Sequence, residues 1–376
     1  MNRLKIAVVI LCFSLENTHA QDKKIKLMTD TVSNSKMEGS RPKNIIFMIG
    51  DGMGATQLYA GMLKNGNHLN IERIKHIGLH KNNSADQLIT DSAAGATAFS
   101  IGEKTYNYAI GVDKDSIPKE TIMETAKNEG LGTGIVVTCT ITHATPASFY
   151  AHQPKRSDIE PIALDFLKQT VDIGIGGGEN YFEKRSDGRN LSAELRQKGY
   201  TVLDTSMDFR TFEGKKLLAF TAAKEPKKIS EGRGETLLDG TKKAIEILGR
   251  DYADKGFFLL VEGSQIDWGG HNNDLDYIMN EVIDFDKAIG AALDFADKDG
   301  NTLVIITADH ETGGTSITAG SVERKDPRGS FTTKLHTATL IPVYAYGKGA
   351  QKFNGIYENT EIYHKMMDAL KLKKIK

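Results

Sequence analysis

The stretch Ile45-Ile46-Phe47-Met48-Ile49-Gly50-Asp51-Gly52-Met53-Gly54 decides how this chain folds. Its first five residues are all apolar and do not alternate with polar ones, which is typical of a parallel strand buried on both faces. The run stops at Asp51 among glycines, which permit the tight turn that a strand end requires. We therefore expect a buried strand that ends in a carboxylate.

Further apolar, β-branched runs repeat this pattern along the chain. Strand-like runs occupy 135–138, 257–261, 303–307 and 341–346, and helical patterns occupy 120–128, 241–248 and 277–296. Their alternation predicts an α/β fold with a largely parallel central sheet sandwiched between helices. Ligands of such sheets gather beyond the carboxyl ends of the strands. Asp51, Glu262 and Asp309 each lie at or just past the end of a run, so we expect them to converge on one edge.

The composition is that of an ordinary soluble enzyme, with 376 residues, 39% of them hydrophobic, and a formal net charge of −1. The 48 basic residues are balanced by 49 acidic ones, and no basic stripe with interleaved aromatic residues occurs. Specific nucleic-acid binding is therefore not expected. The length permits one large domain or two smaller ones. The irregular stretch 174–234 is expected to form a small peripheral insert of helices and loops.

The first twenty residues have the pattern of a secretory signal. Arg3 and Lys5 precede an apolar run over 6–15, and Thr18-His19-Ala20 fits a cleavage site before Gln21. The alternative, a membrane anchor, is disfavoured because a span needs ~20 apolar residues and no segment of the chain provides them. This predicts a periplasmic or secreted protein with a polar arm over 21–42. Only Cys139 would remain after cleavage, so no internal disulfide is expected.

Two pairs of acidic and imidazole side chains suggest metal binding. Asp267 and His271 are four residues apart, which places them on one face of a helical turn, and Asp309 and His310 follow a strand. Either pair alone is compatible with a surface hydrogen bond, but two pairs near strand ends favour a zinc site. His336 is the natural further ligand.

Ser92 follows Asp91 and precedes the small residues 93–96, which suggests an N-cap at the start of a helix that other backbone can approach closely. A purely structural cap is the alternative reading of this serine, and the residues themselves do not decide between the two.

A resemblance to a known family bears on that choice. Asp91-Ser92-Ala93-Ala94-Gly95-Ala96-Thr97-Ala98, followed by 102–107, is similar to the phosphoserine segment of alkaline phosphatases. Other segments resemble that family's signatures in family order: Gly50-Asp51-Gly52-Met53-Gly54, Thr142-His143-Ala144-Thr145-Pro146-Ala147, Val261-Glu262-Gly263 with Ile266-Asp267, Ala308-Asp309-His310-Glu311-Thr312-Gly313-Gly314 and His336-Thr337. The resemblance implies a single domain over 43–376. It is greatest to the compact bacterial members, which include cold-adapted enzymes.

The resemblance also implies roles for individual residues. The residues matching the ligands of a first zinc ion are Asp267, His271 and His336, and those matching a second are Asp51, Asp309 and His310, with the Ser92 oxygen as its remaining ligand. A magnesium ion would take Thr145 and Glu262, with Asp51 as a bridge. Arg156 matches the arginine that binds the phosphate.

Two positions depart from the enterobacterial pattern of the family. His143 stands where that enzyme has an aspartate, and Trp268 stands where it has a lysine. We expect His143 behind the metal ligands and Trp268 at the substrate.

The activity implied is hydrolysis of phosphate monoesters with broad specificity, through a phosphoserine at Ser92, by a homodimer that contains two zinc ions and one magnesium ion per chain. Two alternatives stay open. One is a phosphodiesterase of the same superfamily, and the other is a non-catalytic secreted protein that binds metal or phosphate.

Overall fold

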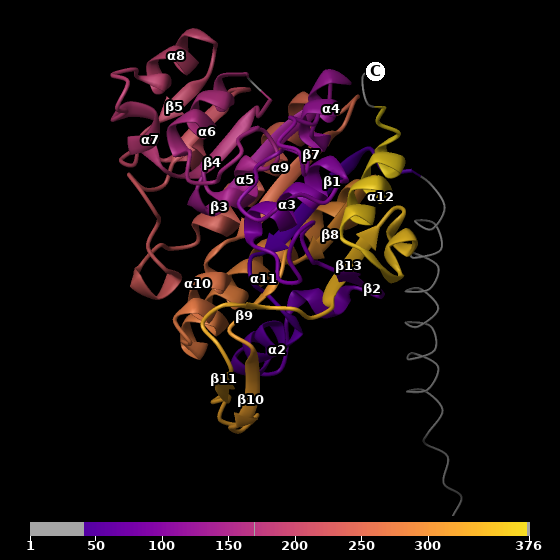
Figure 1. Ribbon diagram of the computed structural model, residues 1–376. Helices are drawn as coiled ribbons and strands as arrows, with labels where there is room; N and C mark the ends of the chain where they lie inside the picture. The colour runs from indigo at the N-terminus through magenta and orange to yellow at the C-terminus, as the bar shows by residue number, and fades with distance from the viewer. Residues whose placement is uncertain (1–40, 169, 374–376) are drawn as a thin grey trace, which may run out of the picture.

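A ten-stranded sheet forms the centre of the protein (Figure 1). The computed structural model describes residues 41–168 and 170–373. The strands of this sheet, in spatial order, are β14 (Gly355–Glu358), β2 (His76–Lys81), β13 (Ile341–Gly347), β8 (Thr302–Thr307), β1 (Asn44–Gly50), β7 (Phe257–Gly263), β3 (Gly132–Thr140), β4 (Ile173–Gly177), β6 (Leu217–Phe220) and β5 (Thr201–Leu203). β13 runs antiparallel to its neighbours β8 and β2, and the other neighbouring strands of the described sheet are parallel. The predicted fold class is therefore confirmed.

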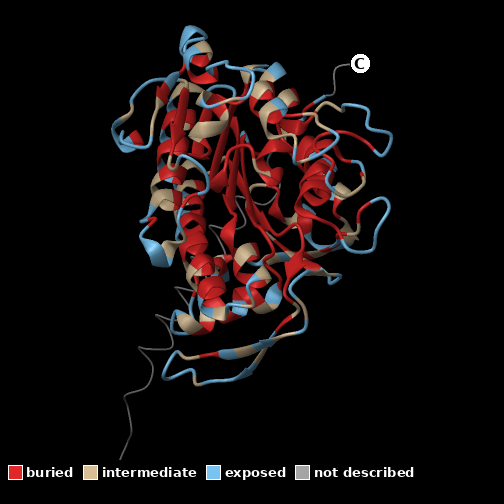
Figure 2. Cartoon of the chain, turned by 60° about the vertical axis from the view of Figure 1, so that its left-hand side comes forward, coloured by how far each residue is buried: buried red, intermediate tan, exposed pale blue. Residues whose placement is uncertain are grey.

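Helices cover both faces of this sheet. They are α2 (Ala55–Lys64), α3 (Ser92–Ile101), α4 (Ile122–Asn128), α5 (Ala144–Ala147), α6 (Ile159–Asp165), α7 (Glu179–Glu183), α8 (Leu191–Gln197), α9 (Thr236–Asp251), α10 (Gln265–His271), α11 (Leu275–Asp299) and α12 (Thr360–Leu370). Alternate residues of β1 enter different cores. Ile45, Phe47 and Ile49 pack with residues of α3, α4 and α12, whereas Ile46 and Met48 pack with residues of α2, α9 and α11. The uninterrupted apolar run thus reflects burial on both faces (Figure 2).

The register of the central strands brings their carboxyl ends together. In the parallel pairing of β1 with β7 and β8, Ile49 lies opposite Glu262 on one side and Thr307 on the other. Asp51 follows β1 directly, and Asp309 follows β8 after Ala308. The three acidic residues therefore meet at one edge, as the sequence predicts.

The stretch 174–234 differs from the expectation. It is peripheral, but besides helices and loops it contains most of β4 and all of β5 and β6, which extend the sheet at one end. The sequence of β4, Ile-Gly-Ile-Gly-Gly, lacks the bulky β-branched pattern that identifies a strand. Gly174 and Gly176 are required there because a Cβ at either position would lie within about 3 Å of side chains such as Leu218 and Val137.

Two short sheets lie near the carboxyl edge. β9 (Glu311–Thr312) pairs with β12 (His336–Thr337), and β10 (Thr315–Ala319) pairs with β11 (Arg328–Phe331) in a hairpin that projects from the body in Figure 1. The predicted signal over 1–20 and most of the predicted arm over 21–42 lie outside the described residues. Across the described part of the chain, no helix is both long and apolar enough to cross a membrane.

Candidate metal and phosphate site

Three fully buried carboxylates form the floor of the site. Asp51, Glu262 and Asp309 are all 0% exposed, and each has one oxygen, Asp51 Oδ2, Glu262 Oε1 and Asp309 Oδ2, without a hydrogen-bond partner among the described residues. Burial, together with the nearby carboxylates, raises the pKa of Asp51 well above its usual range, that of Asp309 to about 7 and that of Glu262 to about 8. Unpartnered buried acceptors of one charge sign are costly unless a cation joins them.

Two histidines at the mouth of the site are oriented by backbone carbonyls. His271 Nδ1 donates to Lys334 O at 2.6 Å, and His336 Nδ1 donates to Thr90 O at 2.8 Å. In the neutral form of each ring these bonds leave the lone pair on Nε2, and the two Nε2 atoms are only 3.2 Å apart. Two lone pairs at that distance repel each other, and a metal ion between them would remove the repulsion. Such orientation by the second ring nitrogen is usual for metal-binding histidines.

The third histidine is oriented through a threonine. His310 Nδ1 lies 3.2 Å from Thr312 Oγ1, which donates its own proton to Asp267 Oδ1. The hydroxyl can therefore accept only from an Nδ1–H, which fixes the tautomer of His310 and leaves Nε2 unprotonated. Burial, which disfavours the charged form, lowers the pKa of His310 well below its usual range. His310 Nε2 lies 3.4 Å from Asp51 Oδ1 and 3.3 Å from Asp309 Oδ2.

The candidate nucleophile lies beside this cluster. Ser92 Oγ is 3.5 Å from Asp51 Oδ1 and 3.2 Å from His310 Nε2, and the residue is 2% exposed. Ser92 was expected to be the N-cap of its helix, which is wrong by one position. Asp91 is the N-cap of α3, with its Oδ1 accepting from Ala94 N at 3.0 Å, and Ser92 is the first helical residue. This frees the Ser92 hydroxyl from capping.

The side chain of Arg156 is held at the site by a hydrogen bond to Asp91. Its Nη1 donates to Asp91 Oδ2 at 2.9 Å, and its backbone N–H donates to Tyr108 O at 2.8 Å. The Asp91 carboxylate therefore holds the helix that carries Ser92 and the guanidinium at the same time. The other terminal nitrogen, Nη2, lies 3.5 Å from His143 Nε2.

A further set of buried side chains could bind a metal ion. The side chains of Cys139, His143 and Glu262 are close enough to share one ion, and Thr145 Oγ1 is buried without a partner among the described residues. Burial and the charge of Arg156 lower the pKa of His143 to about 3, so this imidazole is neutral. The Trp268 ring meets the His143 ring edge-on, with centroids 6.1 Å apart.

The donor atoms group into three candidate metal sites. The groups are Asp267 with His310 and His336, Asp51 with Asp309 and His310, and Cys139 with His143 and Glu262, with the donor atoms of each group within 4.8 Å of one another. His271 adjoins the first group, since its Nε2 is 3.3 Å from Asp267 Oδ2. The structure brings the predicted metal-binding residues together with Ser92, and Trp268 lies against His143. Asp51, Glu262, Asp309 and Thr145 each have a buried side-chain oxygen without a partner among the described residues, and such oxygens are suited to bind a cation.

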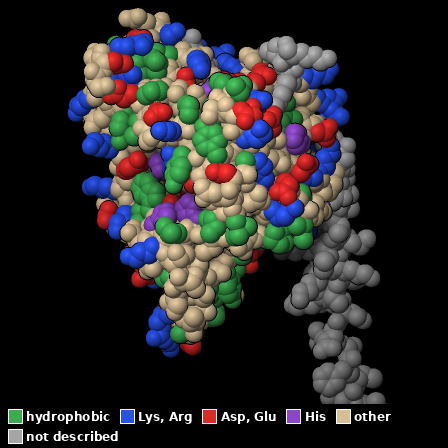
Figure 3. All heavy atoms as spheres, in the orientation of Figure 1, with side chains coloured by type: hydrophobic (Ala, Val, Ile, Leu, Met, Phe, Trp, Pro, Cys, Tyr) green, Lys and Arg blue, Asp and Glu red, His purple; other side chains and the backbone are tan. Residues whose placement is uncertain are grey.

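A cleft of about 720 Å³ leads to this cluster, with Arg156, Asp91, His271 and His336 among its lining residues. Figure 3 shows histidine side chains at the surface of one face, with hydrophobic side chains next to them.

Comparison with known proteins agrees with this geometry. The sequence model of the family described as alkaline phosphatase matches residues 42–329. The chain is 33% identical to alkaline phosphatase 4 of Bacillus subtilis, over 89% of this chain and 90% of that protein. It is 31% identical to the alkaline phosphatase of Escherichia coli, over 88% and 86% of the two chains. The alkaline phosphatase structure from the Antarctic bacterium TAB5 superposes with a TM-score of 0.85 at 45% identity, over 89% of this chain and 99% of that one.

The chain belongs to the alkaline phosphatase family. It is therefore a hydrolase, a metal-dependent phosphomonoesterase, and the family resemblance inferred from its motifs is confirmed.

Two residues of this alkaline phosphatase site were not assigned from the sequence. Asp91 holds Arg156, and Thr312 connects His310 to Asp267. Asp91 could have been found from its place immediately before Ser92, because an aspartate before a helix start is a common cap. No local signal marks Thr312, whose role depends on contacts between α10 and β9.

Proposed function

We propose that this alkaline phosphatase hydrolyses a broad range of phosphate monoesters through a phosphoserine at Ser92, with two zinc ions and one magnesium ion. The carrying observation is that the Ser92 hydroxyl lies beside Asp51 and His310, in a cluster of buried carboxylates that each have an oxygen without a partner among the described residues. The proposed ligands are Asp267, His271 and His336 for the first zinc ion, Asp51, Asp309 and His310 for the second, and Asp51, Thr145 and Glu262 for magnesium. A histidine-to-aspartate variant of the TAB5 enzyme is described with magnesium bound in its M3 site, which supports magnesium as one of the ions.

The side chains divide the reaction between them. When bound, the ions would favour the ionised Ser92 hydroxyl and stabilise the negative charge of the leaving alkoxide. Arg156 binds two phosphate oxygens through its planar fork, held in place by Asp91. Ser92 Oγ attacks phosphorus in line, the ester oxygen leaves, and a phosphoserine forms. Water then attacks phosphorus from the opposite side, the bond to Ser92 Oγ breaks, and inorganic phosphate leaves with the serine regenerated, so that two inversions give overall retention at phosphorus.

Broad specificity follows from the way the charge on the leaving oxygen is stabilised. No protein proton donor is assigned to the leaving oxygen in this scheme, so the rate depends little on which alcohol departs. His143, behind the ligands, and Trp268, toward the substrate, would adjust the binding of magnesium and of phosphate.

The two rival functions make different use of the same residues. A diesterase would have to accommodate a second ester group on the phosphorus, and a non-catalytic binder would need neither a free serine hydroxyl nor its placement 3.2 Å from His310. The free hydroxyl beside three candidate metal groups favours turnover of monoesters.

The decisive experiment compares Ser92→Ala with Ser100→Ala, a buried serine on the same helix whose hydroxyl bonds only to Thr97 O in the described structure. We expect Ser92→Ala to keep its zinc and to lose monoesterase turnover by at least about a thousand-fold. Ser100→Ala should keep most of its activity. Radiolabelled phosphoserine, trapped at low pH, should appear only in the parent and Ser100→Ala. A phosphoenzyme in Ser92→Ala, or a diester turned over faster than a monoester by the parent, would refute the proposal.

We also propose, from the motif pattern and the family, that residues 43–376 form one domain of a periplasmic or secreted homodimer released by cleavage before Gln21. Mass spectrometry of the exported protein and light scattering of the purified protein test the cleavage site and the subunit number separately.

A further inference from the structure

The side wall of the active-site cleft contains an unusual tyrosine. Tyr108 has a φ of 75°, in the left-handed region that favours glycine, and is 59% exposed. A bulky side chain in this conformation is uncommon and costs conformational energy. Strain of this kind persists where surrounding contacts enforce it, and it clusters at functional sites.

The backbone contacts of Tyr108 explain its conformation but not its side chain. Its N–H donates to Asp91 Oδ1 at 3.0 Å, and its carbonyl accepts from Arg156 N at 2.8 Å. The preceding Asn107 reinforces the position, because its side chain accepts from Asp91 N and donates to Ile89 O. Glycine would make both backbone bonds of Tyr108 without strain. The tyrosine ring is also largely outside the core, so neither backbone geometry nor packing requires it.

The position of the ring suggests its use. Tyr108 lines the same cleft as Arg156 and His336, together with the apolar side chains of Ile89 and Leu335. Ile89 is 41% exposed and Leu335 is 68% exposed, so apolar surface continues outward from the polar floor. The volume of about 720 Å³ exceeds what a phosphate group needs and falls in the usual range for small-molecule sites.

We propose that Tyr108, with Ile89 and Leu335, forms a binding subsite for the leaving group, and that this subsite favours phosphate monoesters of alcohols that carry a planar aromatic ring. This rests on the proposed monoesterase function and adds a substrate preference to it. Because the backbone of Tyr108 is fixed on one side by Asp91 and on the other by Arg156, the ring is positioned relative to the phosphate before the substrate arrives. A ring bonded one or two atoms from the ester oxygen can pack on Tyr108 while the phosphate contacts Arg156.

The test compares two non-hydrolysable ligands, benzylphosphonate and ethylphosphonate, as competitive inhibitors of the metal-loaded enzyme. Both carry the same phosphonate head, so the ratio of their inhibition constants reports the ring alone. Tyr108→Asn removes the ring and tolerates the left-handed backbone, whereas Tyr108→Phe retains the ring. Tyr59→Ala, at a 49% exposed tyrosine on α2 that does not line this cleft, is the control.

We expect the parent, Tyr108→Phe and Tyr59→Ala to bind benzylphosphonate more tightly than ethylphosphonate. In Tyr108→Asn the ratio of the two inhibition constants should fall by about three- to ten-fold. The melting temperature of Tyr108→Asn should equal or exceed that of the parent, because strain is relieved. An equal preference in all four proteins would overturn the subsite. A second outcome would also overturn it: the parent is a dimer, Tyr108→Asn is a monomer, and Tyr108→Asn binds both phosphonates more weakly by the same factor. The apolar surface would then be a subunit contact.

Failure of the monoesterase itself is a separate result. If the parent does not hydrolyse ethyl phosphate, the proposed function fails. Phosphorus NMR titration with the two phosphonates then still measures whether Tyr108 favours the ring.

Discussion

The two ends of the central strands differ in how their buried polar groups are hydrogen-bonded. At the amino ends, Asn44 Nδ2 donates to Asp299 Oδ2 and Thr302 Oγ1, and Asn44 Oδ1 accepts from Phe257 N. Thr302 Oγ1 also donates to Asp299. At the carboxyl ends, Asp51, Glu262 and Asp309 each keep an oxygen without a partner among the described residues.

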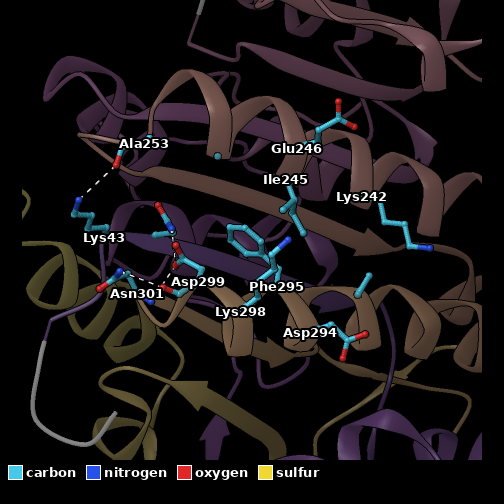
Figure 4. A pocket seen from close by; sticks show the side chains of 13 residues that line it. Lys43, Lys242, Ile245, Glu246, Ala253, Asp294, Phe295, Lys298, Asp299 and Asn301 are labelled. Atoms are coloured by element: carbon cyan, nitrogen blue, oxygen red, sulfur yellow. Dashed lines mark hydrogen bonds between the residues drawn. The ribbon is translucent and has the colours of Figure 1, made fainter. Parts of the chain in front are cut away.

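The same contrast separates the cavities at the two ends. A pocket of about 480 Å³ lies beside the amino ends, between α9 and α11, and Figure 4 shows Lys43, Asp299, Phe295 and Lys298 around it. Asn44, Asp299 and Asn301 in its lining bond to one another and so connect β1 with the end of α11. The cleft at the carboxyl ends leads to buried carboxylates that have oxygens without a partner among the described residues. Polar groups that satisfy each other stabilise the fold, and those that do not are available for metal ions and substrate.

Metal removal should produce the largest difference between the two ends. A chelator should abolish activity and lower the melting temperature, because ions that bind only the native state stabilise it, by about 4 kcal/mol when their concentration is a thousand times Kd. Zinc with magnesium should restore both. Asp299→Asn, at the amino end, should cost about 1 kcal/mol whether or not the chelator is present. Calorimetry with turnover assays checks this, and chelator-resistant activity would mean that the carboxylate cluster is not the catalytic centre.

Matched threonines at the two ends make the comparison sharper. Thr312→Val removes the hydroxyl between His310 and Asp267, and we expect zinc affinity to fall by about ten- to a hundred-fold, as for other groups that orient metal ligands. Thr302→Val removes an equally buried hydroxyl at the amino end and should lower stability with little change in zinc affinity. Competition with a chromogenic chelator measures both. Equal zinc affinity in the two variants would show that His310 does not need Thr312.

Replacing Trp268 by lysine tests how an added positive charge at the carboxyl end changes the binding of phosphate. Its indole can offer phosphate at most one neutral hydrogen bond, whereas a lysine would add a charge-assisted one. Such a contact is worth about 1.5–3 kcal/mol, so inorganic phosphate should inhibit Trp268→Lys roughly ten-fold more strongly or better. Turnover should fall if release of phosphate limits the rate. Trp268→Phe controls for the lost indole. An unchanged inhibition constant would indicate that Trp268 only packs, as its edge-on contact with His143 allows.

The sequence predicted the carboxyl end better than the amino end, for a physical reason. Strands such as β1 and β7 are buried on both faces, so their apolar runs are continuous and their ends are sharp. The proposed ligand pair Asp267 and His271 lies on one helical turn, so local spacing indicates it. Metal chemistry needs particular residue types, and the family motifs preserve their order.

What the sequence did not predict depends on contacts between distant segments. Asn44 and Thr302 look like ordinary strand-end residues until the sheet brings them together. Thr312 acts only because α10 places Asp267 against β9. Strands β4, β5 and β6 are short or glycine-rich, so the neighbouring strands, and not their own propensities, determine them.

The smallest predicted effect concerns a partnered charge away from both strand ends. His152 Nδ1 donates to Gly111 O at 2.7 Å and Nε2 donates to Glu124 Oε1 at 2.9 Å, which requires the protonated ring. Burial opposes that charge, but the hydrogen bond and charge of Glu124 outweigh it, and the pKa of His152 is raised. A raised folded-state pKa stabilises the protein fully below the unfolded value of about 6.5, and this stabilisation is lost as pH rises through the folded pKa.

His152→Gln should therefore cost about 1 kcal/mol at pH 6 and less at pH 9, measured by denaturant unfolding. His68 and Glu72 provide the matched exposed pair, with a 2.7 Å contact between side chains that are 76% and 41% exposed. Solvent screens such a pair, so His68→Gln should cost less at either pH. An equal cost for the two variants, or a cost of His152→Gln that grows with pH, would show that the contact with Gly111 depends on packing and not on the charge of His152.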